Sequence, residues 1–109
     1  MSIELPVQPG CRIDLPRPDV SEPVRMAALL ADPTRAGILA LLANGPVCVC
    51  EMAAALGERQ NNVSNHLARL RDAGLVRATR HVADARWIYY ERDEGACRAA
   101  AAAITRLLG

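Results

Sequence analysis

Apolar residues recur at helical spacing along most of the chain, and each run stops at residues that cap or break a helix. Ser21 followed by Glu22-Pro23 predicts the N-cap and first turn of a helix that runs roughly to Ala31. Asp32-Pro33 repeats this signal, and the helix that it opens is apolar on most sides. Asn-Gly-Pro at 44–46 ends that second helix, since glycine closes a helix and proline forbids its continuation.

Two further helices are expected on either side of a turn at Gly57, over residues 47–56 and 60–73. In the second of these, Val63, Leu67 and Leu70 have the spacing of one buried helix face. The other face is polar and rich in side-chain amides. A short helix, a turn and a second helix with such an outer face are typical of a helix–turn–helix that reads DNA.

The period then changes, and strand-forming residues cluster around Trp87-Ile88-Tyr89-Tyr90. They predict two strands, over 75–82 and 86–91, joined by a turn at 83–85. Asp93 is expected to cap a final, alanine-rich helix over 94–108. The order α-α-α-α-β-β-α predicts a mainly α (α+β) winged helix–turn–helix over 20–109. The proline-rich residues 1–19 are expected to form an extended, mobile arm.

The composition of the chain indicates its cellular compartment and a local excess of positive charge. The 109 residues suit one domain, and the net charge of +1 says nothing about nucleic acid. Residues 59–92, however, hold seven arginines against three acidic residues, a local net charge of +4. We find neither a signal peptide pattern nor a run of about eighteen apolar residues, so we expect a cytoplasmic protein that has no membrane partner. Disulfides are rare there, so the four cysteines are expected to act as ligands, redox sensors or core fillers.

The polar face of the second helix of the pair supplies the candidate DNA contacts. Amide and hydroxyl side chains pair with base edges or phosphates. The base or phosphate candidates are Gln60, Asn61, Asn62, Ser64, Asn65 and His66. The phosphate or minor-groove candidates are Arg69, Arg80, His81 and Arg86. Ser64, His66 and Asp72 also form a nominal catalytic set, but all three lie on one helix with no oxyanion loop, so we expect no enzyme.

Cys48 and Cys50 stand at a predicted helix start, where the helix dipole is expected to lower a thiol pKa. If the backbone there is extended, the two thiols point the same way and form a two-thiolate claw. The alternative is that both are small buried hydrophobes. Thiolates select soft ions. A third thiol comes from Cys11, whose arm can span about 30 Å to Ser21, or from Cys97 on the final helix.

At this point the chain resembles the ArsR/SmtB metal-sensing repressors. The matching runs are Cys-Val-Cys-Glu-Met at 48–52, Asn-Val-Ser-Asn-His-Leu at 62–67 and Leu-Arg-Asp-Ala-Gly-Leu-Val at 70–76, with Ala-Asp-Pro-Thr-Arg at 31–35. The resemblance covers about 24–108. It implies a homodimer, paired through the first and last helices, that binds double-stranded operator DNA when apo and releases it when an inducer binds.

Departures from the family pattern bear on the inducer. The third cysteine of many arsenic sensors is Ala53 here, and the final helix lacks the histidines of the zinc and cobalt sensors. Cys11 is similar to the arm cysteine of family members that sense cadmium or lead. The expected metal site is therefore Cys11, Cys48 and Cys50, with Cd, Pb or As(III) as inducer and no organic cofactor. The alternative is a thiol-redox or persulfide-responsive repressor that uses Cys48 or Cys50 with Cys97.

Overall fold

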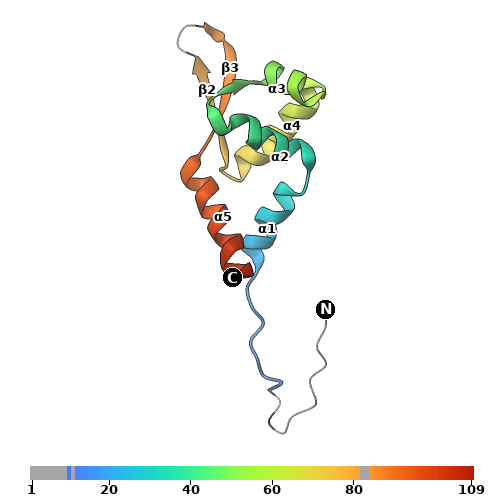
Figure 1. Cartoon of the computed structure of the whole chain (residues 1–109), viewed down its shortest axis with the longest axis vertical. Coiled ribbons are helices and arrows are strands. Elements are labelled where there is room, and N and C mark those ends of the chain that lie inside the picture. Colours follow the sequence, from blue (N-terminus) through green and yellow to red (C-terminus); the bar gives the residue numbers. More distant parts are fainter. Residues whose placement is uncertain (1–9, 11, 82–83) are drawn as a thin grey trace.

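Five α-helices and one small antiparallel sheet make up the described part of the chain, residues 10, 12–81 and 84–109 of the computed structural model. The helices are α1 (Ser21–Leu30), α2 (Pro33–Leu41), α3 (Val49–Leu56), α4 (Gln60–Asp72) and α5 (Glu94–Leu108), with a 3-10 turn η1 (Leu42–Asn44). The strands are β1 (Val47–Cys48), β2 (Val76–His81) and β3 (Asp84–Arg92). The fold is the expected winged helix–turn–helix, with α3 and α4 as the helix pair and the β2–β3 hairpin as the wing (Figure 1).

Local capping chemistry sets most helix boundaries. Asp32 caps α2, and its Oδ1 accepts hydrogen bonds from the backbone N–H groups of Thr34 at 2.8 Å and Arg35 at 3.1 Å. Gly57 closes α3 with φ +65°, a left-handed conformation that glycine adopts without a steric cost. The expected cap at Ser21 is wrong. Ser21 is already helical, and the carboxylate of Asp19 accepts hydrogen bonds from its backbone N–H and hydroxyl.

The sheet has a third strand that the sequence did not predict. Val47 and Cys48, expected in the third helix, instead pair with Tyr90 and Tyr89 as β1, giving the strand order β1-β3-β2. The wing strands also differ from the expected ranges. Asp84, expected in the turn, is the first residue of β3 and pairs with His81, next to a register shift in β2.

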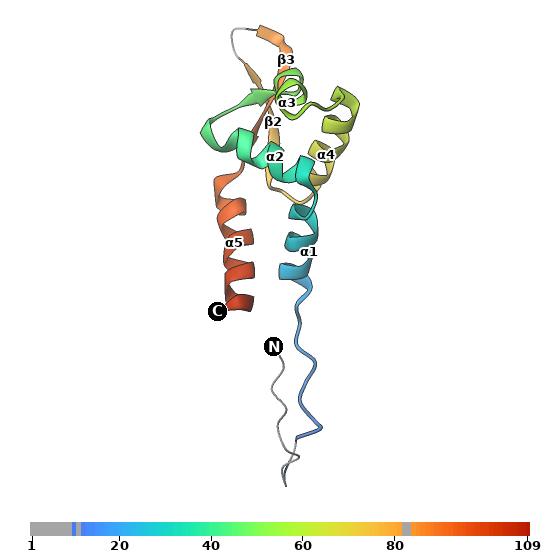
Figure 2. The same ribbon diagram turned by 45° about the vertical axis from the view of Figure 1, so that its right-hand side comes forward.

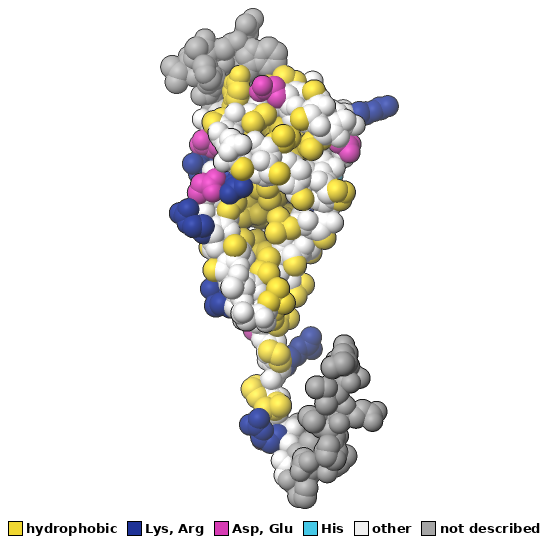
Figure 3. Space-filling model, viewed as in Figure 1, with side chains coloured by type: hydrophobic (Ala, Val, Ile, Leu, Met, Phe, Trp, Pro, Cys, Tyr) yellow, Lys and Arg dark blue, Asp and Glu magenta, His cyan; other side chains and the backbone are white. Residues whose placement is uncertain are grey.

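The core lies where α2, α3 and α4 meet the start of β2. Its largest fully buried side chains are Ile38, Leu42, Met52, Val63, Leu67 and Leu70. α1 and α5 pack against each other and extend away from the helix–turn–helix, on the side opposite the wing (Figures 1 and 2). Hydrophobic side chains gather on the face between these two helices (Figure 3). In the described ranges, no single helix is long and apolar enough to cross a membrane. Only α1 and the segment Pro33–Asn44 together, with an 85° bend between them, meet both requirements.

Candidate nucleic-acid interface and metal centre

The helix α4 presents a polar face to solvent. Its inner face is fixed by Val63, Leu67 and Leu70, which are fully buried. The exposed candidates on its outer side are Gln60, Asn61, Ser64, Asn65 and Arg69. Because side chains three and four residues apart share a helix face, Asn61, Ser64 and Asn65 form one continuous amide and hydroxyl surface. This surface has the donors and acceptors that base edges require.

Asn62 and His66 are half-buried and already have protein partners. The Asn62 amide donates to the Glu58 carboxylate at 2.8 Å, and the other oxygen of Glu58 accepts from the Thr34 hydroxyl at 3.4 Å. His66 Nδ1 lies 3.1 Å from Arg35 Nη1. Its position therefore differs from the expected one on the outer face, because the ring is directed toward the start of α2.

The basic candidates are spread over two regions. Arg69 lines a shallow groove between α4 and α1, together with Arg25, Leu29, Asp72 and Ala73. Arg80, His81 and Arg86 belong to the wing strands β2 and β3, toward the end of the hairpin where the two strands are joined. The wing and the outer face of α4 therefore carry the two groups of candidate DNA contacts.

Cys48 and Cys50 converge at the junction of β1 and α3. Their sulfur atoms lie 3.0 Å apart. The backbone of Cys48 is extended, with φ −85° and ψ 161°, and Cys50 follows in the first turn of α3. The sequence predicted that the two thiols can point the same way if the backbone here is extended. The backbone of Cys48 has this conformation, and the two sulfurs do converge.

Burial dominates the acid–base chemistry of this pair. Cys48 is only 5% exposed, and burial, followed by its hydrogen bond with Cys50 and the proximity of the Glu51 carboxylate, raises its pKa to about 11. The expectation of a lowered pKa at this helix start is therefore wrong for Cys48. Glu51 also accepts the Cys48 backbone N–H at 3.1 Å and so completes the cap of α3. The Cys48 thiol is thus neutral at pH 7, and any ion that binds its sulfur as a thiolate displaces a proton.

Comparison with known proteins identifies the family to which the chain belongs. Residues 32–78 match the family described as "Bacterial regulatory protein, arsR family". A solution structure of a homodimeric winged helix-turn-helix DNA-binding domain from Mycobacterium bovis, described as a possible ArsR-family transcriptional regulator, has a TM-score of 0.63 and 30% identity. That match covers 82% of this chain and 79% of the other. This chain belongs to the ArsR family.

Two curated relatives share the helix–turn–helix region with this ArsR-family chain. The "Arsenical resistance operon repressor" of Escherichia coli K12 is 39% identical over 69 residues, 62% of this chain and 56% of that protein. The "HTH-type transcriptional regulator CmtR" of Mycobacterium bovis is 51% identical over 55 residues, 50% of this chain and 47% of that protein. The chain thus spans about half the length of these relatives.

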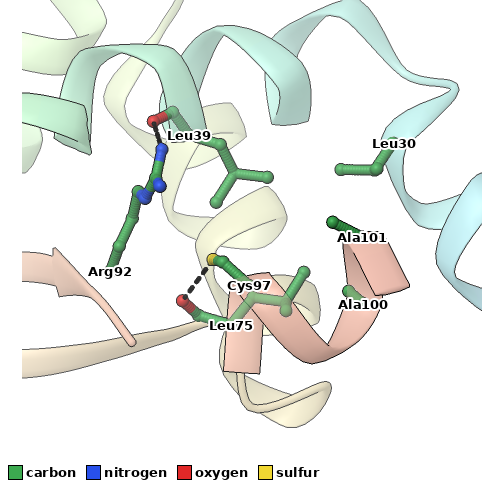
Figure 4. A pocket seen from close by; sticks show the side chains of 7 residues that line it. All are labelled: Leu30, Leu39, Leu75, Arg92, Cys97, Ala100 and Ala101. Atoms are coloured by element: carbon green, nitrogen blue, oxygen red, sulfur yellow. Dashed lines mark hydrogen bonds between the residues drawn. The ribbon is translucent and has the colours of Figure 1, made fainter. Parts of the chain in front are cut away.

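The fourth cysteine of the ArsR-family chain lies in a different pocket from the pair. Cys97, near the start of α5, lines a mainly apolar pocket of about 150 Å³ with Leu30, Leu39, Leu75, Arg92, Ala100 and Ala101 (Figure 4). Its thiol lies 3.8 Å from the Leu75 carbonyl oxygen. Burial raises the pKa of Cys97, and the nearby Arg92 opposes that rise. Neither Cys48 nor Cys50 is among the residues that line that pocket.

No group of three or more His, Cys, Asp or Glu side chains suited to a metal ion occurs in the described part of the chain. Cys11, the expected third ligand, lies outside the described residues. The described residues thus bring Cys48 and Cys50 together without a third side chain of these types in a metal-binding group.

Sequence reasoning missed three residues that organise this region. Glu51 stands three positions after Cys48, the spacing of a capping box, so its role had a readable signal. Glu58 and Arg35 contact α4 from the turn before it and from α2. The Glu58–Asn62 contact spans only four positions and so has a local signal, whereas the contacts of Glu58 with Thr34 and of Arg35 with His66 are set by the tertiary fold.

Proposed function

We propose that this ArsR-family chain is a homodimeric transcriptional repressor that binds operator DNA when apo and releases it when a soft thiophilic ion binds its cysteines. The observation that carries this proposal is the pair of thiols 3.0 Å apart at the start of α3, the helix directly before the reading helix α4. The name of the Escherichia coli relative, an arsenical resistance operon repressor, agrees with an inducer of this class.

The two sulfurs suit a single soft ion. Protein metal–thiolate bonds are about 2.3 Å long for an ion such as zinc, and the sulfur separation of 3.0 Å is less than two such bonds. One ion can therefore contact both sulfurs. Thiolate ligands favour soft ions, so we expect Cd(II), Pb(II) or As(III). The α5 helix has no histidine for an imidazole-rich zinc site.

Cys11 is the third ligand in this proposal. Cys11 and Ser21 are ten positions apart, and an extended segment of that length spans about 30 Å. Such a reach allows Cys11 to meet Cys48 and Cys50 of its own subunit or of the partner. The redox alternative would need Cys97 instead, and the separate pocket around Cys97 argues against that pairing within one subunit.

A homodimer supplies two reading heads, which match the two half-sites of an inverted repeat. The apolar side chains of Val24 on α1 and Leu107 and Leu108 on α5 are more than half exposed, which suits a dimer interface on these helices. The related Mycobacterium bovis domain is described as homodimeric. In each head, Gln60, Asn61, Ser64 and Asn65 face base edges, and wing and helix-end arginines face phosphates.

The position of the thiol pair explains how an ion would change DNA affinity. Cys48 pairs with Tyr89 of the wing strand β3, and Cys50 lies in α3, which leads through Gly57 into α4. An ion that draws the two sulfurs together with a third ligand thus acts on the wing and the helix pair at once. Coupling of about 1–3 kcal/mol per site would change operator affinity roughly 5–150-fold, and DNA would weaken ion binding equally.

The test is a titration of the reduced protein with arsenite, Cd(II) and Pb(II), in which thiolate-to-metal absorption and DNA release are followed together. Cys48→Ser or Cys50→Ser alone should weaken both signals and the double variant should abolish them, while Cys97→Ser serves as the matched control and should leave them intact. Cys11→Ser should weaken ion binding or uncouple it from DNA release and leave apo binding unchanged. Release by persulfide or peroxide alone, with no response to any ion, would refute the proposal.

A further inference from the structure

The Arg35 side chain joins three helices through all of its nitrogen atoms. Its Nε donates to the Leu29 carbonyl at 2.6 Å, and its Nη2 donates to the Ala28 carbonyl at 3.4 Å. Its Nη1 lies 3.1 Å from His66 Nδ1. Arg35 itself lies on α2, the two carbonyls lie in the last turn of α1, and His66 lies on α4. One half-buried guanidinium therefore connects α1 to the reading helix.

Arg35 adds to the cap of α1, in which the Ala31 backbone N–H already donates to the Ala28 carbonyl at 3.3 Å. The last carbonyls of a helix have no partner within it, and a cation there also meets the negative end of the helix dipole. The last turn of α1 holds no basic residue, and its C-cap is Ala31 in an ordinary helical conformation. Arg35, from the next helix, supplies the charge and the N–H groups that donate to the Leu29 and Ala28 carbonyls.

In the neutral imidazole of His66, the contact with Arg35 fixes which ring nitrogen carries the proton. A guanidinium donates hydrogen bonds and accepts none, so Nδ1 must carry the lone pair that receives Arg35 Nη1. The ring proton then lies on Nε2, which is 3.9 Å from Asp32 Oδ1. Only 17% of the His66 side chain is exposed, and the same Asp32 carboxylate caps α2. The ring is therefore held on one side by the guanidinium and faces the capping carboxylate on the other.

His66 shares α4 with Ser64 and Asn65, so anchoring its ring on Arg35 restrains the rotation of α4 about its own axis and with it the direction of the exposed amide surface. We infer that Arg35 is a positioning residue that orients the reading face of α4 through His66 and ties that orientation to α1. α1 also packs against α5, and these two helices form the proposed dimer interface. Arg35 therefore connects the orientation of the reading helix to that interface. The inference rests on the proposed function in taking α4 as the reading helix.

The experiment uses the full chain and the duplex that the wild-type protein selects from a random-sequence DNA pool. Arg35→Lys keeps the charge but cannot reach both α1 and His66, and it should lower affinity about tenfold at fixed salt. Asparagine and leucine form a matched pair at position 66. Asparagine places an oxygen where Nδ1 lies, whereas leucine has the same shape without an acceptor. His66→Asn should stay within about threefold of wild type, and His66→Leu should lose about tenfold.

Two further readouts separate positioning from stability and from direct DNA contact. Nitrogen NMR of the free protein should show His66 protonated at Nε2 and not at Nδ1, and urea unfolding should show every variant folded at the assay temperature. The variant carrying both Arg35→Lys and His66→Leu should bind the duplex no more weakly than the weaker single variant. The reason is that both substitutions remove the same contact, between Arg35 and His66. Additive losses, an Nδ1-protonated ring, or equal affinity of the leucine and asparagine variants would overturn the inference. If the wild type selects no duplex, the proposed function fails instead.

Discussion

The buried Cys48 thiol predicts that ion binding depends steeply on pH. Its pKa of about 11 lies four units above neutrality. Removing its proton at pH 7 thus costs about 5 kcal/mol, since each unit is worth about 1.4 kcal/mol. An ion that binds the thiolate has to displace this proton, so its apparent affinity rises about tenfold per pH unit below the pKa. Between pH 6 and pH 8 this one thiol should raise Cd(II) affinity about 100-fold.

The assay is competition between the reduced protein and a chelator with known protonation constants, read by thiolate-to-cadmium absorption at several pH values. Cys97→Ser is the control that should keep the full slope, because neither Cys48 nor Cys50 lines the pocket around Cys97. Cys48→Ser should bind Cd(II) more weakly. Its Cd(II) affinity should also lack the tenfold rise per pH unit that the Cys48 proton causes in the wild type. A slope that is flat in the wild type, or identical in wild type and Cys48→Ser, would refute the assignment of Cys48 as a protonated ligand.

Three more outcomes follow from burial and exposure. Because folding raises the pKa of Cys48 from 9.0 to about 11, its contribution of roughly 2–3 kcal/mol is complete below pH 9. That contribution is lost as the pH rises to 11. Urea unfolding with a reductant should show this loss in wild type and not in Cys48→Ser. Asn65→Ala should cost about 1–3 kcal/mol of discrimination at the bases it contacts, measured against single-base variants of the selected duplex at fixed salt. An unchanged base preference would exclude Asn65 from readout. Leu67→Ala should destabilise the fold by about 2–5 kcal/mol in urea unfolding, since Leu67 is fully buried on the inner face of α4. A loss below 1 kcal/mol would contradict that packing.

The sequence predicted the features that are local. Asp32 and Asp93 cap helices through bonds to residues two or three positions away, and Gly57 closes α3 with its own backbone angle. Helical spacing likewise identified the buried face of α4. The overall winged helix–turn–helix follows from these signals and from the change to strand-forming residues near Trp87.

What the sequence could not predict depends on residues far along the chain. β1 has only two residues and exists because it pairs with Tyr89 and Tyr90, about forty positions later. His66 stands beside Leu67 at the edge of the buried face, where periodicity alone does not decide its direction. Arg35, thirty-one positions earlier, decides it. For Cys48, the helix start favours a thiolate, but desolvation by the packed core is the larger effect and reverses the expected pKa shift.

That reversal bears on which stimulus the thiol pair suits. Oxidants react with thiolates, so a thiol with a pKa of about 11 is thiolate in only about one molecule in ten thousand at pH 7. A soft ion is different, because its bond to sulfur forms as the proton leaves and offsets the cost of losing it. Burial at the β1–α3 junction therefore disfavours peroxide-type chemistry at Cys48 more than it disfavours ion binding. The same packing that raises the pKa also joins Cys48 to the wing strand and to α3, so an ion that overcomes the cost acts directly on the elements proposed to read DNA.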